Sequence, residues 1–178
     1  MSTCKKIIFI TAILSLFCGT AQNAFPQELK KVYTVILRDT GGKEAWLPYT
    51  GEHPIVIIYE DFRNLGDNRE LYLKAMKKPE LLDKIKLIYI SNTRPAWYIP
   101  DYFIYRFFRE REPVHPGVTF LIDTNRSLQK KWRLLDSDGK SVIILVSKEG
   151  KIIDIVYHTP GAKGLDKIID SLWSIIDF

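Results

Sequence analysis

The sequence predicts an α/β protein, a three-layer α/β/α sandwich around a central mixed sheet that ends in a C-terminal hairpin plus helix. Two continuous apolar runs, residues 54–59 and 85–90, are typical of strands buried on both faces, as in parallel sheets that helices cover. A segment with helical spacing separates them, so a right-handed crossover would make the two strands parallel neighbours. Two further strands joined by a tight turn near the C-terminus would pair antiparallel, which makes the sheet mixed.

In the first half of the chain, one more strand and one helix are expected. The β-branched and aromatic run at residues 32–37 predicts a strand, closed by the Asp-Thr-Gly-Gly turn that starts at Asp39. Apolar residues recur at helical spacing over residues 65–76, and Pro79 marks the end of that helix.

The second half alternates strands with helices. An aromatic-rich helix within residues 98–111 is expected to begin near Pro100, because proline favours the first turn of a helix. The Lys-Glu-Gly sequence at residues 148–150 is strong turn chemistry and joins two apolar runs into a hairpin. The other expected elements are a strand at 118–122, a helix at 128–134, the hairpin strands at 141–146 and 151–157, and an amphipathic helix at 164–176.

The N-terminus has the pattern of a secretory signal peptide. Two lysines precede an apolar run at residues 7–17, which is too short to span a bilayer in comfort. Small residues up to Ala21 suit a signal peptidase, so we expect a signal peptide at 1–21, a short lead-in at 22–31 and a single domain at 32–178. This organisation predicts export to the periplasm. An uncleaved N-terminal anchor is the alternative.

Only two cysteines occur, Cys4 and Cys18, and both lie inside the expected signal peptide. After cleavage the product would have no thiol, and therefore no disulfide, no thiolate-bound metal and no cysteine nucleophile. Cys18 could instead carry a lipid and make the protein a membrane-anchored lipoprotein, although bulky residues precede it. Contact with a membrane is expected only if Cys18 is lipidated or the signal segment is retained.

The charge and the histidines argue against two classes of site. Removing Lys5 and Lys6 from the 26 basic residues leaves 24 against 21 acidic residues, a net charge of +3, and the two signs are mixed along the chain. That pattern is typical of a solvated surface, so no nucleic-acid partner is expected. His53, His115 and His158 lack the spacing of metal ligands, and neither a metal nor another cofactor is expected.

Several stretches resemble proteins of the redoxin kind. Residues 118–134 are similar to the peroxiredoxin-type strand, Asp-led turn and helix that precede a final hairpin, and residues 142–153 resemble that hairpin. With Asn92-Thr93 after the second buried strand and Pro-Gly-Val-Thr-Phe-Leu-Ile-Asp at 116–123, the chain resembles the YtfJ family of exported bacterial proteins. The resemblance implies a thioredoxin-like fold over nearly the whole mature chain.

The chain departs from thiol-dependent relatives at the site that matters for redox chemistry. In those relatives the redox cysteine follows the first central strand, where a helix N-terminus lowers the pKa of the thiol. Here residues 59–64, Tyr-Glu-Asp-Phe-Arg-Asn, take that place, and residues 139–142 lack the proline that accompanies the thiol. We therefore expect a non-catalytic binding or structural module whose partner is another envelope protein. The alternatives are a thioredoxin- or peroxiredoxin-related oxidoreductase and an unrecognised hydrolase that uses Glu60 and Asp61.

Glu60 and Asp61 allow two interpretations. They could act as an acid–base pair or bind a cation near Arg63. Alternatively, Asp61 or Asn64 caps the following helix and the charges are solvated, and this structural reason is sufficient for an acidic residue there. We favour the second interpretation.

Segment 94–111 has the most unusual composition of the chain, with seven aromatic residues and four arginines. Helical spacing puts Phe103, Ile104, Phe107 and Phe108 on one apolar face, so a core helix with a surface fringe is the favoured interpretation. Aromatic residues mixed with arginine also suit a protein interface or a membrane-surface helix. In the fold that the resemblance implies, the segment would lie at the carboxyl end of the sheet, where ligands bind in open α/β sheets. The candidate binding residues are therefore Glu60, Asp61, Arg63, Arg94, Trp97, Tyr98, Tyr102 and Arg106.

Overall fold

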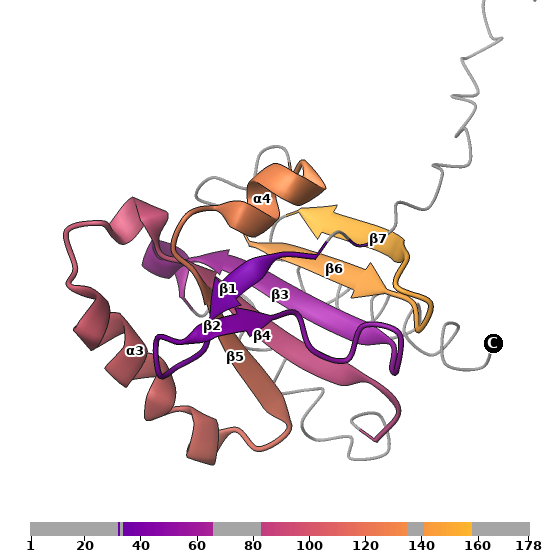
Figure 1. Ribbon diagram of the computed structural model, residues 1–178, viewed down its shortest axis with the longest axis horizontal. Helices are drawn as coiled ribbons and strands as arrows, with labels where there is room; N and C mark the ends of the chain where they lie inside the picture. Colours follow the sequence, from indigo (N-terminus) through magenta and orange to yellow (C-terminus); the bar gives the residue numbers. More distant parts are fainter. Residues whose placement is uncertain (1–31, 33, 66–82, 135–140, 158–178) are drawn as a thin grey trace, which may run out of the picture.

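A computed structural model describes residues 32, 34–65, 83–134 and 141–157 (Figure 1). The expected signal peptide with its two cysteines, nearly all of the expected helix at 65–76 and the whole of the one at 164–176 lie outside the described residues. No helix in the described residues is long and apolar enough to cross a membrane.

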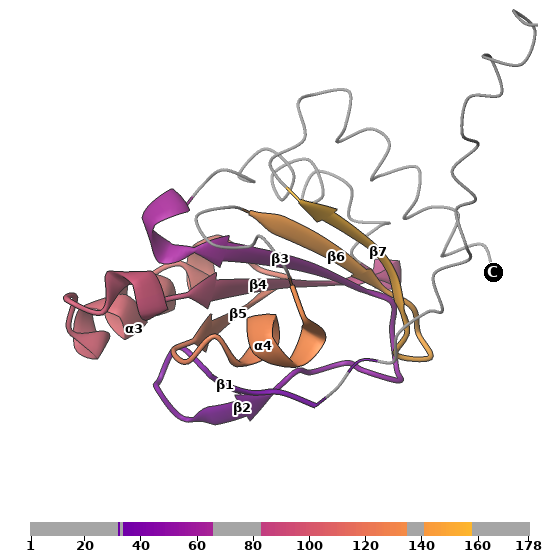
Figure 2. The ribbon, with the colours of Figure 1, turned by 90° about the horizontal axis from the view of Figure 1, so that it is seen from above.

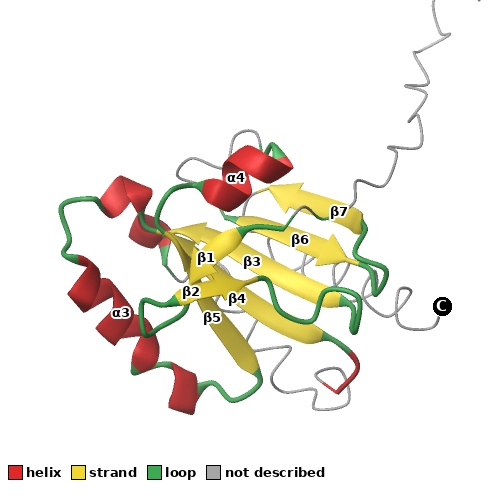
Figure 3. Ribbon diagram, viewed as in Figure 1, coloured by secondary structure: helices red, strands yellow, loops and turns green. Residues whose placement is uncertain are grey.

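The described strands form one mixed sheet in the order β2-β1-β5-β4-β3-β6-β7 (Figures 1 and 3). The central strands β3, β4 and β5 are parallel to one another, and the other neighbouring pairs are antiparallel. The α/β class and the mixed sheet are thereby confirmed. The bounds are β1 (Ile36–Arg38), β2 (Glu44–Trp46), β3 (Ile55–Asp61), β4 (Lys86–Asn92), β5 (Val118–Asp123), β6 (Val142–Val146) and β7 (Ile152–Tyr157).

The two apolar runs occupy the middle of the sheet, as the sequence predicts. All seven residues of β3 are buried, because strands pair with it on both edges and side chains cover both of its faces. β3 and β4 run parallel, in register from Ile55 opposite Lys86 to Asp61 opposite Asn92. The expected parallel pairing of these strands is therefore confirmed.

Successive side chains of the central strands point alternately into two cores, one on each face of the sheet. Helix α3 (Asp101–Arg109) contributes Phe108 to one core, and helix α4 (Ser127–Trp132) contributes Trp132 to the other. Figure 2 shows α3 and α4 lying apart from each other beside the sheet. The three-layer arrangement follows from this alternation. Short 3-10 helices lie in the connections: η1 (Phe62–Asn64), η2 (Arg94–Ala96) and η3 (Glu112–Val114).

The N-terminal part of the sheet is a hairpin, which the sequence analysis did not predict. β1 is shorter than the strand expected at 32–37, and the turn after Asp39 leads directly into β2. The two strands pair antiparallel with Ile36 opposite Trp46. The sequence Glu-Ala-Trp of β2 has too few β-favouring residues to show as a strand by itself, and it is ordered by pairing with β1.

The turn of this hairpin is built on Asp39, whose carboxylate accepts hydrogen bonds from the backbone N–H groups of Gly41 at 2.9 Å and Lys43 at 2.8 Å. Gly42 has a φ of 82°, and a Cβ at this position would lie 2.9 Å from the ring of Tyr105 in α3. Glycine is thus required both for the turn and for the close approach of the hairpin to α3.

Candidate functional site

The carboxyl ends of the three parallel strands carry buried polar residues. The register places Asp61 of β3 opposite Asn92 of β4, and Asn92 opposite Asp123 of β5. Residues in register share a face of the sheet, so these three side chains form one row on the face that α4 covers. We call Asp61, Asn92 and Asp123 the polar row. One position earlier, Glu60 lies in register with Ser91 and faces the side of α3. All five residues are at most 1% exposed.

Asp123 joins the end of β5 to the start of α4. Its Oδ1 accepts a hydrogen bond from the N–H of Ser127 at 2.7 Å, and its Oδ2 accepts from the N–H of Leu128 at 2.9 Å and from the hydroxyl of Tyr59 at 3.3 Å. Its backbone carbonyl accepts from the N–H of Thr93 at 3.1 Å. One residue of β5 thus connects α4, β3 and the loop after β4.

Asp61 forms an ion pair with Arg63 where the resemblance to redoxins would place a cysteine. The guanidinium donates through Nη2 to Oδ2 at 2.7 Å and through Nε to Oδ1 at 3.2 Å. The backbone N–H of Arg63 donates to Oδ1 at 3.0 Å, which makes Asp61 the N-cap of η1. The Asp61 side chain is fully buried and that of Arg63 is 51% exposed, so only the cationic side of the pair faces solvent.

Glu60 faces away from Asp61 and accepts a hydrogen bond from the hydroxyl of Tyr89. Both Glu60 and Asp61 are 0% exposed. The expectation that an acidic residue caps the next helix is confirmed for Asp61, but the expectation that the two charges are solvated is wrong. The physical reason is that β3 continues to pair with β4 as far as Asp61, which carries both carboxylates into the interior.

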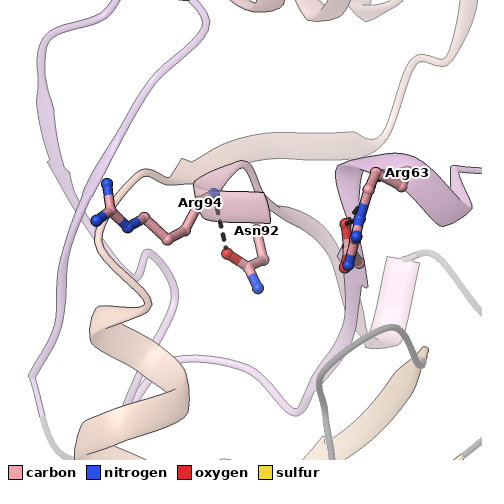
Figure 4. A network of polar contacts seen from close by, with 4 residues as sticks. Arg63, Asn92 and Arg94 are labelled. Carbon is pink, nitrogen blue, oxygen red and sulfur yellow. Dashed lines mark hydrogen bonds and ion pairs between the residues drawn. The ribbon is translucent and has the colours of Figure 1, made fainter. Parts of the chain in front are cut away.

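Two buried polar groups at this edge, Nδ2 of Asn92 and Oγ of Ser91, have no hydrogen-bond partner among the described residues. The other amide atom of Asn92, Oδ1, accepts from the N–H of Arg94 at 3.2 Å, where the chain turns into η2. Figure 4 shows Asn92 with Arg94 on one side and Arg63 on the other. The side-chain oxygen of Asn92 therefore stabilises the turn into η2, while its buried amide N–H donors have no partner among the described residues, which costs free energy.

Four exposed aromatic side chains follow this edge along the chain. Trp97, Tyr98, Tyr102 and Phe103 are 78%, 63%, 64% and 58% exposed. The ring centroids of Trp97 and Tyr98 lie 6.3 Å apart, and those of Tyr102 and Phe103 lie 5.6 Å apart. We call these four residues the aromatic surface. Large apolar side chains exposed together on one segment are characteristic of an interaction site.

The prediction that Phe103 belongs to the core face of its helix is wrong, whereas Ile104 and Phe108 are buried as expected. Residues four apart lie on the same side of an α-helix, and Phe103 is turned about 100° from Ile104. The buried stripe of α3 is narrow, so it takes in Ile104 and Phe108 and leaves Phe103 outside. The surface fringe of this helix is therefore wider than the sequence pattern indicates.

The candidate arginines differ in what they contact. Nε of Arg106 donates to Oε1 of Glu110 on the outer side of α3 at 2.8 Å, so the charge of Arg106 is already paired within its own helix. The side chain of Arg94 is exposed and forms no hydrogen bond or ion pair with the described part of the chain. Since η1 and η2 lie against each other, the structure brings the segments of Arg63 and Arg94 to the same edge, as the sequence analysis expects.

Sequence reasoning named no role for several residues at this edge. The sequence pattern includes Asn92 and Asp123 only in segments of family resemblance, and it predicts no role for Ser91 or Tyr89. A signal for two of them is present, because Asn92 and Asp123 each directly follow a buried apolar run. Aligning the ends of neighbouring parallel strands would have placed them beside Asp61.

The two candidate acid–base residues at this edge are enclosed. A general acid or base must come within hydrogen-bond reach of the proton that it moves, and Glu60 and Asp61 are both buried and engaged. Within the described ranges, no group of three His, Asp or Glu side chains is arranged to hold a metal ion. The groups that face solvent are Arg63, Arg94 and the aromatic surface, and these suit binding.

Replacing Asp123 by alanine is expected to destabilise the protein by about 3 kcal/mol or more, because buried N–H groups at the start of α4 lose their acceptor. Asp39→Ala is the matched control, since Asp39 also accepts two backbone N–H bonds but does so in an exposed turn, and it should cost about 1 kcal/mol. Urea unfolding of both variants measures this. Equal costs would show that the Asp123 network does not hold the edge together.

The same experiment has a pH dependence. Burial raises the pKa of Asp123 above its ordinary value, and the hydrogen bonds from Ser127 and Leu128 oppose this shift without cancelling it. The contribution of an acid with a raised folded pKa is complete below its unfolded pKa of about 3.9 and is lost as the pH rises through the folded pKa. The stability difference between wild type and Asp123→Ala should therefore shrink upward from about pH 4. A difference that grows with pH would contradict the raised pKa.

Comparison with known proteins gives matches among solved structures alone. No protein family model matches the chain, and no curated protein sequence matches it. A peroxiredoxin-like protein from Aquifex aeolicus is similar with a TM-score of 0.58 and 14% identity, over 81% of this chain and 86% of that one. A putative thiol:disulfide interchange protein DsbE from Chlorobium tepidum has a TM-score of 0.61 and 11% identity, over 83% and 96% of the two chains.

An uncharacterised thioredoxin-like protein from Porphyromonas gingivalis is also similar, with a TM-score of 0.60 and 15% identity over 82% of this chain and 92% of that one. Each of these similarities extends over most of both chains. At such identities the likeness concerns the fold, and it agrees with what the resemblance to redoxins implied. The chain has a thioredoxin-like fold with a seven-stranded mixed sheet.

Proposed function

We propose that the protein is an exported thioredoxin-fold protein of the YtfJ kind that acts in the cell envelope as a non-catalytic binding or structural module. The observation that carries the proposal is the aromatic surface, which adjoins a carboxyl edge whose own carboxylates are buried. Trp97 and Tyr102 are 78% and 64% exposed. Tryptophan, tyrosine and arginine are the residues that dominate the binding energy of protein interfaces. The proposed partner is another envelope protein.

Two features favour binding over catalysis. Residues 19–178 contain no cysteine, so a thiol-dependent reaction would have no nucleophile within the fold. The hydrolase alternative would need Glu60 or Asp61 to reach a substrate, and both carboxylates are buried beneath Tyr89 and Arg63 contacts. The described residues thus combine an exposed aromatic surface with buried carboxylates, and this combination supports binding.

The proposal of export rests on the sequence of residues 1–21, with its lysines, apolar run and small residues before the expected cleavage site. It places the protein in the periplasm. Attachment of a lipid at Cys18 is the alternative, and it would hold the same domain at a membrane.

The binding role is tested by truncating the aromatic surface. Trp97→Ala and Tyr102→Ala are each expected to weaken capture of the envelope partner by about 2 kcal/mol or more, because exposed aromatic anchors dominate interfaces. A photo-crosslinker at position 98 of the full chain identifies that partner, and its affinity for the purified variants is then measured. The melting temperature should not change, because both side chains are exposed.

Trp46→Ala is the matched control for this experiment. Trp46 is 58% exposed but lies in β2, an edge strand that is not part of segment 94–111, so its removal should leave affinity unchanged. Normal binding by folded Trp97→Ala and Tyr102→Ala would place the binding surface elsewhere. Unfolding of both would show that these residues serve the core.

The non-catalytic role predicts that recombinant residues 22–178 neither reduce insulin disulfides nor consume peroxide in the presence of a thiol donor. Both reactions need a thiolate, and this stretch of sequence has no cysteine. Rates are compared with a buffer control before and after repurification. Turnover that follows the protein through repurification would reinstate the oxidoreductase alternative.

The export proposal predicts a mature protein that begins near Gln22. Intact-mass analysis of the protein purified from the cell envelope measures this, because loss of residues 1–21 leaves a defined mass. A species that retains Cys18 and carries the added mass of a diacylglycerol would make the protein a lipoprotein instead.

A further inference from the structure

We propose that the aromatic surface recognises a carboxylate next to an apolar side chain in a segment of its protein partner, and that Arg94 is the residue that binds this carboxylate. The inference rests on the proposed binding function and adds the chemistry of what is bound. It assigns different roles to Arg94 and Arg106, which the sequence pattern treats as equivalent.

Hydrogen bonds to buried residues of the sheet fix the backbone at Arg94. Its N–H donates to Oδ1 of Asn92 at 3.2 Å, and Asn92 is 0% exposed in the polar row. Thr93, the residue between them, is 5% exposed and donates its N–H to the carbonyl of Asp123 at 3.1 Å. The main chain is therefore held at the strand end while the side chain of Arg94 extends away from Asn92, as Figure 4 shows. A positioned cation loses less entropy on binding than one on a loose loop.

Neighbouring arginines already have partners. Arg63 is held by buried Asp61, and Arg106 by Glu110. Arg109 donates to the carbonyl of Thr40 at 3.2 Å. Arg94 forms no such contact with the described residues, so its fork of N–H donors is open to an external acceptor. Carboxylates match the planar geometry of guanidinium.

Trp97 supplies the apolar half of the site. Side chains three residues apart eclipse each other in a 3-10 helix, and Arg94 begins η2 while Trp97 is its C-terminal cap. Both are exposed. The turn between them is fixed, because Ala96 is 0% exposed and donates its N–H to Thr93 at 2.9 Å. A cation and a broad aromatic side chain thus lie on one side of a single rigid turn.

The charge pattern favours a protein segment over an anionic lipid surface. Attraction to anionic membranes grows with the number of basic residues close to the surface. Around the aromatic surface, Asp101 and Glu110 are exposed, and Glu110 neutralises Arg106. A mixture of charges with one open guanidinium suits a single carboxylate in a peptide better than a continuous negative surface.

Two short peptides test the inference, acetyl-Gly-Leu-Glu-Phe-Glu-Leu-Gly-amide and the same peptide with glutamine in place of each glutamate. They are titrated into the protein, and isothermal titration calorimetry measures their affinity, so that the measurement does not depend on the fluorescence of Trp97 itself. The glutamate peptide should bind at least about tenfold more tightly than the glutamine peptide, since charge-assisted bonds to guanidinium are the strong ones. Arg94→Gln should remove this preference.

Lys148→Gln is the matched control, because it removes the same charge from the exposed turn between β6 and β7, at the opposite end of β3. It should preserve the preference, and so should Arg106→Gln. A preference that survives Arg94→Gln, or is lost equally in Lys148→Gln, overturns the assignment of Arg94.

The remaining outcomes separate this inference from the binding function itself. If both peptides bind equally and Trp97→Ala abolishes both, the aromatic surface binds proteins but the carboxylate inference is wrong. If neither peptide binds while vesicles of phosphatidylcholine and phosphatidylglycerol bind the protein and Trp97→Ala weakens that binding, the surface faces a membrane and the inference is also wrong. If none of these probes binds, the inference is overturned, and the crosslinking experiment decides separately whether the surface binds a protein.

Discussion

Three parallel strands that end in register place their last side chains next to one another, and here those side chains are Asp61, Asn92 and Asp123. Burying a polar side chain is costly unless it is hydrogen-bonded, and burying a carboxylate is costlier still. The protein meets this constraint in the same way three times: each side chain accepts the backbone N–H of the residue two positions later in the chain, Arg63, Arg94 and Asn125 respectively. Turns of this kind are a general property of aspartate and asparagine. The polar row therefore shapes all three loops that leave the carboxyl edge.

That constraint explains where the aromatic surface lies. Its segment begins at Asn92, and the bonds of Asn92 and Thr93 determine how η2 leaves the sheet. Further along, Ile104 and Phe108 attach α3 to the core below. The exposed rings between these two anchors are carried on backbone fixed at both ends. Interfaces built on rigid elements lose less entropy on binding than those on free loops.

The sequence was sufficient for the central strands and insufficient for the edge. Continuous apolar runs predict β3 and β4, and a right-handed crossover between them predicts that they are parallel. β2 could not be predicted, because Glu-Ala-Trp becomes a strand only through its pairing with β1. At the candidate site, composition identified Trp97 and the residues around it, but the burial of Glu60 depends on how far β3 stays paired with β4, which is a tertiary property. The burial of Phe103 is wrongly predicted for a related reason. Helical spacing indicates which side of α3 is apolar, but not how wide a strip of that side the sheet covers.

The Asp61–Arg63 pair favours the loop after β4 over the end of β3 as the place for the proposed binding function. A redox cysteine must be reachable and reactive, whereas Asp61 is fully buried and its partner Arg63 is 51% exposed. Removing one partner of a buried ion pair leaves an uncompensated charge and is strongly destabilising. Asp61 and Arg63 are thus committed to stability and cannot vary freely to suit a ligand. The adjacent loop carries no such commitment at Trp97, Tyr98 and Arg94, whose side chains point to solvent. Under the proposed binding function, changes of specificity at these three positions would cost the fold least.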